Sequence, residues 1–128
     1  MMYRIVVVMC LCGMILGCAD DGGLKPVSGV VRIDGQPAQG VNVIFVPLEG
    51  GRANSMAQTQ ADGHFSLRYT SQYAGTLPGE YKVLITKEES DTGKELIPER
   101  FSSGGKTTLR ATVEEGRDND FNFEIESK

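Results

Sequence analysis

The stretch His64-Phe65-Ser66-Leu67-Arg68-Tyr69 alternates apolar and polar residues with a period of two. Successive side chains of an extended chain point to opposite faces, so Phe65, Leu67 and Tyr69 share one face and the polar residues share the other. The turn signal Ala61-Asp62-Gly63 directly precedes this stretch. The pattern predicts a half-buried β-strand that begins after a tight turn.

The same alternation predicts six further strands, and no segment predicts a helix. The predicted turn Asp34-Gly35-Gln36-Pro37, which contains the strong turn signal Asp-Gly, follows the first of them. The predicted strands cover residues 27–33, 41–47, 56–60, 64–69, 81–86, 107–113 and 121–126. Seven short strands separated by turn signals are typical of an all-β, two-sheet antiparallel sandwich with Greek-key connections.

Composition limits the architecture and the partners. The chain has 128 residues, which is room for one domain, and its 16 glycines and many β-branched residues disfavour helices. The formal charge of −4 becomes −5 without the first 17 residues, because Arg4 is their only charged residue. An acidic domain repels phosphate backbones, so we expect no nucleic-acid partner.

Residues 1–17 have the anatomy of an export signal. A short cationic start ends at Arg4, and the run Ile5–Leu16 is apolar throughout except for one glycine. A membrane-spanning helix needs about 20 apolar residues, and this run is shorter. We therefore expect a signal peptide and not a permanent membrane span.

The end of the apolar run, Ile15-Leu16-Gly17-Cys18, resembles the lipobox of bacterial lipoproteins. The resemblance implies that Cys18 carries the lipid, palmitate included, becomes the new N-terminus and holds the protein on the cell membrane or the outer membrane. Ordinary signal cleavage that leaves Cys18 as a free thiol is the alternative. Residues 18–26 are then the lipidated cysteine and a flexible linker, and the domain covers residues 27–128.

The sequence offers no residues for catalysis, a cofactor or a metal in this domain. No cysteine follows Cys18, so the domain has no disulfide, thiolate nucleophile or zinc–thiolate site. His64 is the only histidine, and it lies on the polar face of its strand. The Asp-Gly turns lack the run of alternating acidic residues that a calcium loop needs. We expect a protein that is not an enzyme.

Several motifs together resemble the carboxypeptidase regulatory-like domains. These are Val27 to Pro37 (VSGVVRIDGQP), Gly40-Val41, Ala61 to Phe65 (ADGHF) and Pro78 to Val83 (PGEYKV). The resemblance covers nearly all of residues 27–125, and small bacterial lipoproteins that carry this domain alone are the narrower match. It implies a transthyretin-like (prealbumin-like) fold and an accessory, non-catalytic role.

The connection over residues 88–106 is longer than most loops of a compact domain, and such loops are usually functional or disordered. If each connection reverses the strand direction, this loop lies opposite the lipid tether, beside the turns at Asp34 and Asp62. It is a possible partner-binding loop, with candidate residues Asp91, Lys94, Glu95, Glu99 and Arg100. The alternative is a mobile acidic loop, pinned to the sandwich by Leu96, Ile97 and Phe101.

The sequence thus predicts a non-catalytic, membrane-anchored lipoprotein of the cell envelope that serves as a structural or binding module. Its partner would be an envelope protein or a polysaccharide. Two alternatives are a carbohydrate-binding module, for which Tyr73 is the one candidate aromatic outside the predicted core, and a hydrolase with an unrecognised site.

Overall fold

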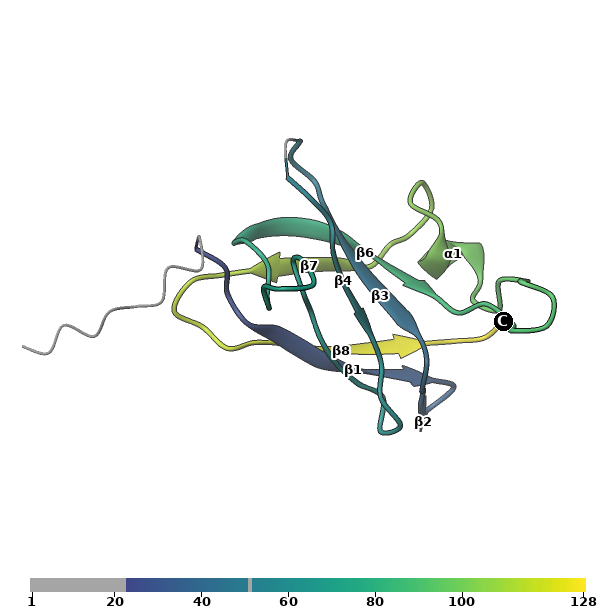
Figure 1. Cartoon of the computed structure of the whole chain (residues 1–128). Coiled ribbons are helices and arrows are strands. Elements are labelled where there is room, and N and C mark those ends of the chain that lie inside the picture. Colours follow the sequence, from purple (N-terminus) through teal and green to yellow (C-terminus); the bar gives the residue numbers. More distant parts are fainter. Residues whose placement is uncertain (1–22, 51) are drawn as a thin grey trace, which may run out of the picture.

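Alternating apolar side chains fold the chain into two β-sheets that enclose one hydrophobic core (Figure 1). The computed structural model describes residues 23–50 and 52–128. These residues form eight strands and one short helix. In chain order they are β1 (Val27–Ile33), β2 (Gln36–Pro37), β3 (Asn42–Pro47), β4 (Ser55–Gln58), β5 (His64–Ser66), β6 (Gly79–Thr86), α1 (Glu99–Ser102), β7 (Arg110–Val113) and β8 (Asn119–Ile125).

The first sheet is built around β1. One edge of β1 pairs with β5 and β2, and the other edge pairs with β8 along its whole length, from Val27 opposite Asn119 to Ile33 opposite Ile125. The second sheet has the order β4-β3-β6-β7, with every neighbouring pair antiparallel. A bridge between Met56 and Arg68 connects the two sheets beside β4.

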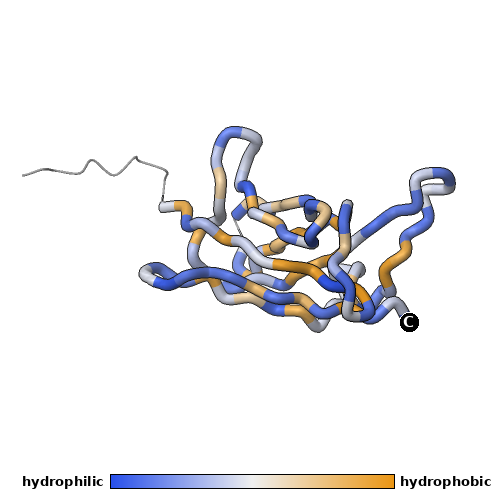
Figure 2. The backbone as a smooth tube through the Cα atoms, turned by 90° about the horizontal axis from the view of Figure 1, so that it is seen from below, coloured by the Kyte–Doolittle hydropathy of each residue, from blue (hydrophilic) through white to orange (hydrophobic). Residues whose placement is uncertain are grey.

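Most of the core consists of inward-facing strand residues that the alternation predicts, together with Ala38 and Ile97 from outside the predicted strands. Tyr69, Leu109 and Phe121, also predicted to face inward, are half-buried. Phe45, Phe65, Val83 and Ile85 are fully buried, and the ring of Phe45 lies 5.5 Å from that of Tyr81. Burying such side chains is the main favourable contribution to folding, at about 25 cal/mol for each Å² of apolar surface. Figure 2 shows the corresponding alternation of hydrophobic and hydrophilic residues along the strands.

The structure corrects three predictions of topology. It has eight strands where seven were predicted, because Gln36–Pro37, predicted as part of a turn, pairs with the end of β1. The sheets are not all antiparallel, because β1 and β8 run in the same direction (Figure 1). A four-residue helix, α1, forms where no helix was predicted, in a segment too short to show helical periodicity.

The domain also starts before the predicted boundary. Leu24 is only 6% exposed, and Lys25 exchanges main-chain hydrogen bonds with Thr76, at 2.8 and 3.0 Å. Residues 24–26, assigned to the flexible linker, therefore pack as part of the sandwich. The predicted signal peptide and Cys18 lie outside the described residues.

Candidate functional site

The predicted partner-binding loop starts with an ordered β-hairpin. Glu88 and Glu95 form an antiparallel bridge, the amide of Leu96 donates to the carbonyl of Lys87 at 2.8 Å, and the amide of Glu89 donates to the carbonyl of Lys94 at 2.8 Å. We call residues 87–96 the distal hairpin. It projects beyond β6 at the end of the sandwich opposite residue 23, and its tip is hydrophilic (Figures 1 and 2). The turn after β1, at Asp34, lies at the same end (Figure 1).

Glu95 holds the base of the distal hairpin together. Its Oε2 accepts a hydrogen bond from the amide of Lys87 at 2.7 Å and another from the amide of Ile97 at 3.1 Å. A carboxylate that accepts two main-chain hydrogen bonds is already engaged by its own chain. Glu95, predicted as a partner contact, therefore has a structural role.

The rest of the connection lies on the sandwich. Ile97 is 4% exposed in the core, and Phe101 packs against the core from α1. Thr107 Oγ1 donates to the carbonyl of Val83, and Lys82 Nζ donates to the carbonyl of Gly104. Leu96, predicted to help pin the loop, is 42% exposed. Ile97 and Phe101 thus hold the second half of the connection on the sandwich, and only the distal hairpin projects from it.

Glu99 and Arg100 also have partners within the molecule. Lys106 forms an ion pair with Glu99; this hydrogen bond lowers the pKa of Glu99 and raises that of Lys106. Arg100 pairs with Glu126 at 3.7 Å and donates to the carbonyl of Lys128. The contacts of Arg100 attach α1 to the C-terminal end of the chain, and the Glu99–Lys106 pair joins α1 to the segment that follows it.

Asp91 and Lys94 remain as outward-facing candidates. Both are exposed at the hairpin tip, and neither side chain has an ion pair within residues 23–50 and 52–128. The amide of Gly93, whose φ is +71°, closes the turn by donating to the carbonyl of Glu89 at 2.8 Å. The structure therefore brings two of the five predicted residues together as an accessible pair of opposite charges on a short, hydrogen-bonded turn.

The other residues considered from the sequence form no reactive cluster in the described structure. His64 is half-buried on the outer face of β5, where its amide donates to Asp62 Oδ1 at 3.0 Å. Tyr73 is 49% exposed in a turn closed by main-chain bonds to Tyr69 and Thr70. In the part of the chain that is described, no three histidine, cysteine or acidic side chains are placed to hold a metal ion. Nor does this part contain a helix with the length and hydropathy of a membrane span.

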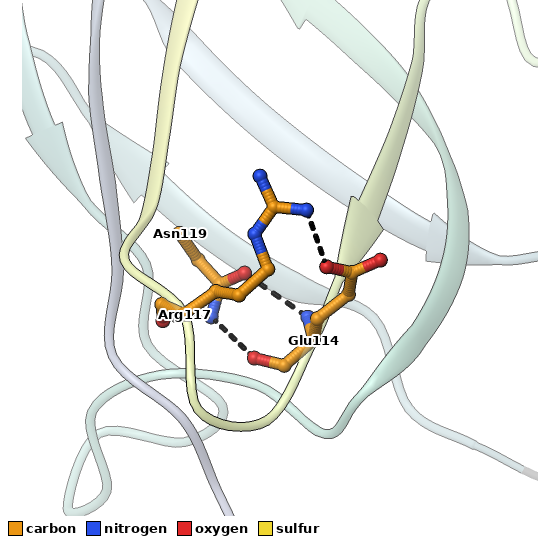
Figure 3. A network of polar contacts seen from close by, with 3 residues as sticks. All are labelled: Glu114, Arg117 and Asn119. Carbon is orange, nitrogen blue, oxygen red and sulfur yellow. Dashed lines mark hydrogen bonds and ion pairs between the residues drawn. The ribbon is translucent and has the colours of Figure 1, made fainter.

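Sequence reasoning missed a polar network at the opposite end of the molecule (Figure 3). The side-chain amide of Asn119 accepts from the amide of Glu114 at 3.0 Å and donates to its carbonyl at 3.0 Å. Arg117 pairs with the Glu114 carboxylate at 2.7 Å. Asn119 is 9% exposed, and a pocket of about 250 Å³ opens beside the network. The Asp118-Asn119-Asp120 sequence signals a turn, but only the fold shows what the amide pairs with.

No protein-family model matches this chain, and no curated protein matches it either. The resemblance to carboxypeptidase regulatory-like domains stays a prediction from the sequence motifs.

Proposed function

We propose that the chain is a non-catalytic lipoprotein of the bacterial cell envelope, exported and held on a membrane by an acyl chain on Cys18. The observation that carries the proposal is the apolar run Ile5–Leu16, which follows a cationic start and closes on Gly17-Cys18. The sandwich begins to pack at Leu24, so only residues 19–23 would separate it from the lipid. A tether of this length would keep the domain close to the bilayer surface.

The domain itself we assign to the transthyretin-like, carboxypeptidase regulatory-like class. The motifs that carry the resemblance occupy β1 and its turn, the turn before β5, and the start of β6. They are turn glycines and core residues, which specify a fold and not a reaction. The proposed role is accordingly binding or structural.

The distal hairpin is the proposed contact with an envelope protein. It is the part of the long connection that projects from the sandwich, and Asp91 and Lys94 carry opposite charges at its tip. Binding surfaces are often loops held by a rigid scaffold. Here the Glu95 carboxylate and the buried Ile97 hold the hairpin base, so the tip is presented in a defined position.

The anchor is tested by replacing the lipidated thiol. We expect Cys18→Ser to abolish incorporation of labelled palmitate and to release the protein from the membrane fraction, because a hydroxyl replaces the thiol of the cysteine that is proposed to carry the lipid. Cys12→Ser, inside the apolar run, is the matched control and should leave palmitate incorporation and membrane association unchanged. Retention of Cys18→Ser on membranes with an unmodified N-terminal region would contradict the proposal.

The partner surface is tested by crosslinking in intact envelopes. The double variant Asp91→Ala with Lys94→Ala should lose the crosslinked partner. The control is the double variant Glu99→Ala with Lys106→Ala, which should keep the crosslinked partner. It also removes one acidic and one basic residue from this connection, but these two residues form an ion pair with each other. An unchanged set of crosslinks in the first variant would overturn the role of the hairpin.

A further inference from the structure

The edge of β7 is open. Among the described strands β7 pairs with β6 alone. The register places Lys82 opposite Arg110 and Glu80 opposite Thr112, and the amide of Val83 donates to the carbonyl of Leu109. Hydrogen-bonded and non-hydrogen-bonded pairs alternate in an antiparallel ladder, so the main-chain groups of Arg110 and Thr112 point away from β6. They offer two donors and two acceptors to another strand.

The next outward-facing position of this edge is already paired, and it shows the pattern that a further strand would follow. Glu114 lies two residues beyond Thr112, and the Asn119 side chain bonds both its amide and its carbonyl (Figure 3). The side-chain amide has one acceptor and two donors, so it can replace the peptide group of a strand residue. Its main chain meanwhile pairs with Val27 in the other sheet. Asn119 thus fixes where an added strand must end, next to Thr112.

A groove lies along this edge. The pocket of about 250 Å³ is lined by Arg110, Ala111 and Thr112 from β7 and by Asn119, Asp120 and Phe121 from β8. Phe121 is half-buried, and its ring stacks 6.1 Å from that of Phe123. An apolar side chain of an added strand would meet this aromatic ring at the side of the sandwich, where β7 and β8 are not paired with each other.

The charges around the groove select the occupant. The lining includes the carboxylates of Glu114, Asp118 and Asp120 and the guanidinium groups of Arg110 and Arg117. Arg117 is paired with Glu114, and Arg110 donates to the carbonyls of Thr107 and Leu109 on its own chain. Asp118 and Asp120 have no ion pair within the described residues. Two free carboxylates beside the groove favour a cationic segment.

We propose that the β7 edge binds an extended, lysine- or arginine-bearing segment of another protein, which adds as a fifth strand to the β4-β3-β6-β7 sheet. Main-chain hydrogen bonds to Arg110 and Thr112 supply the affinity, Phe121 receives an apolar side chain, and Asp118 and Asp120 select basic residues. This site is separate from the distal hairpin and does not depend on the proposed lipid anchor.

The probe is a synthetic peptide, Lys-Val-Lys-Val-Lys-Val, acetylated and amidated at its ends. We titrate it into the ¹⁵N-labelled full chain in detergent micelles. The expected result is saturable amide shifts at Arg110, Thr112 and Phe121, with slower hydrogen exchange at the first two. A peptide with glutamate in place of each lysine should bind at least about tenfold more weakly, because like charges meet at the groove.

Backbone recognition is tested on the unaltered protein with N-methylated peptides. Alternate residues of a strand point their amides to opposite edges. Methylating one set of alternate amides should abolish binding, and methylating the other set should leave the dissociation constant within about twofold. Equal binding by both peptides, or shifts confined to β4 or the distal hairpin, would show that no strand is added to β7.

Charge selection is tested with variants of the protein. The double variant Asp118→Asn with Asp120→Asn should weaken binding of the lysine peptide about three- to tenfold, the range expected for two exposed ion pairs. Glu124→Gln removes a charge from the same face of β8 outside the groove and should change nothing. Equal effects of the two variants on the dissociation constant would show that Asp118 and Asp120 do not select basic residues.

Concentration-dependent shifts at Arg110 and Thr112 without peptide would show that a second copy occupies the edge, and this would overturn the proposal.

Discussion

At the scale of single residues, Asp34 joins the turn after β1 to the segment that follows β8. It adopts a φ of +51° in the turn after β1, and its carboxylate accepts from the amide of Ser127 at 3.0 Å and from its hydroxyl at 2.5 Å. These two hydrogen bonds lower the pKa of Asp34 below the ordinary value of 3.8. The folded state therefore favours the ionised carboxylate, so the contact stabilises the fold above about pH 3.8 and is lost as the pH falls through the lower, folded pKa.

A titration of Asp34 followed by NMR checks this linkage. We expect Ser127→Ala to raise the pKa of Asp34 towards 3.8, because the hydroxyl bond makes the largest contribution to the shift. The Glu99 carboxylate, which depends on Lys106, should keep its lowered pKa and serves as the internal control. If the pKa of Asp34 stays equally low in Ser127→Ala, the hydrogen bond from the Ser127 hydroxyl is not the cause of the lowered pKa.

Gly29 is required by close packing inside β1. A Cβ atom built at this position would lie 2.1 Å from the carbonyl oxygen of Phe121 and 2.7 Å from the ring of Phe65. Neither a strand backbone nor a buried ring can move aside cheaply. We expect Gly29→Ala to lower the free energy of unfolding by about 3 kcal/mol, measured by urea denaturation. Gly105→Ala, where nothing lies within 4 Å, should cost less than about 0.5 kcal/mol. Equal effects would contradict the packing argument.

At the scale of elements, alternation predicted the strands that have a buried face. The inward side chains of β1, β3, β6 and β8 are those that the period of two selects. The alternation does not predict which strands pair or in which direction, so it did not predict the parallel pairing of β1 and β8. This pairing arises because β7 ends and β8 begins at the end where residue 23 lies, so β8 leaves that end in the same direction as β1 (Figure 1).

The contacts that the candidate loop residues make within their own chain could not be predicted from the sequence, for a physical reason. Whether a charged residue already has a partner in its own chain cannot be read from its neighbours in sequence when that partner is distant along the chain. Glu95 bonds the amide of Lys87, and Arg100 pairs with Glu126 from the end of β8. Glu99 and Arg100 are exposed like Asp91 and Lys94, but both have ion pairs. Among the five candidates, only Asp91 and Lys94 are exposed without an ion pair within the described residues. The Asn119 network could not be predicted for the same reason, since the Asn119 side-chain amide meets the main chain of Glu114 only in the folded chain.

Thr59 connects the end of β4 to the loop before β3. It is 4% exposed, and its Oγ1 donates to the carbonyl of Ala38 at 2.6 Å and accepts from the amide of Val41 at 2.9 Å. Thr59→Val leaves both groups buried without partners, so we expect a loss of about 2 kcal/mol in the free energy of unfolding. Thr59→Ser keeps the hydroxyl and should cost about 1 kcal/mol or less. If thermal or urea unfolding shows the two variants to be equally stable, the hydroxyl has no such role.

At the scale of the whole molecule, the two proposed binding sites are the distal hairpin and the β7 edge. They lie towards opposite ends of the sandwich (Figure 1). Lys25, near the start of the domain, pairs with Glu115 in the turn between β7 and β8 at 3.8 Å. The β7 edge is therefore near the proposed tether, whereas Asp91 lies at the far tip. A lipid on Cys18 would turn the distal hairpin towards partners away from the membrane and leave the β7 edge facing segments close to it.

This orientation can be measured because the chain has no cysteine after Cys18, so one new thiol can be labelled specifically. The acylated protein carrying Asp91→Cys or Glu115→Cys is labelled with a donor fluorophore in liposomes that contain an acceptor on the lipid headgroups. We expect stronger energy transfer from position 115 than from position 91, because position 115 is close to the tether. Replacing Glu115 removes only an exposed ion pair, whose contribution to stability is at most about 1 kcal/mol. Equal transfer from the two positions would mean that the sandwich lies flat on the bilayer, with both sites at the same height.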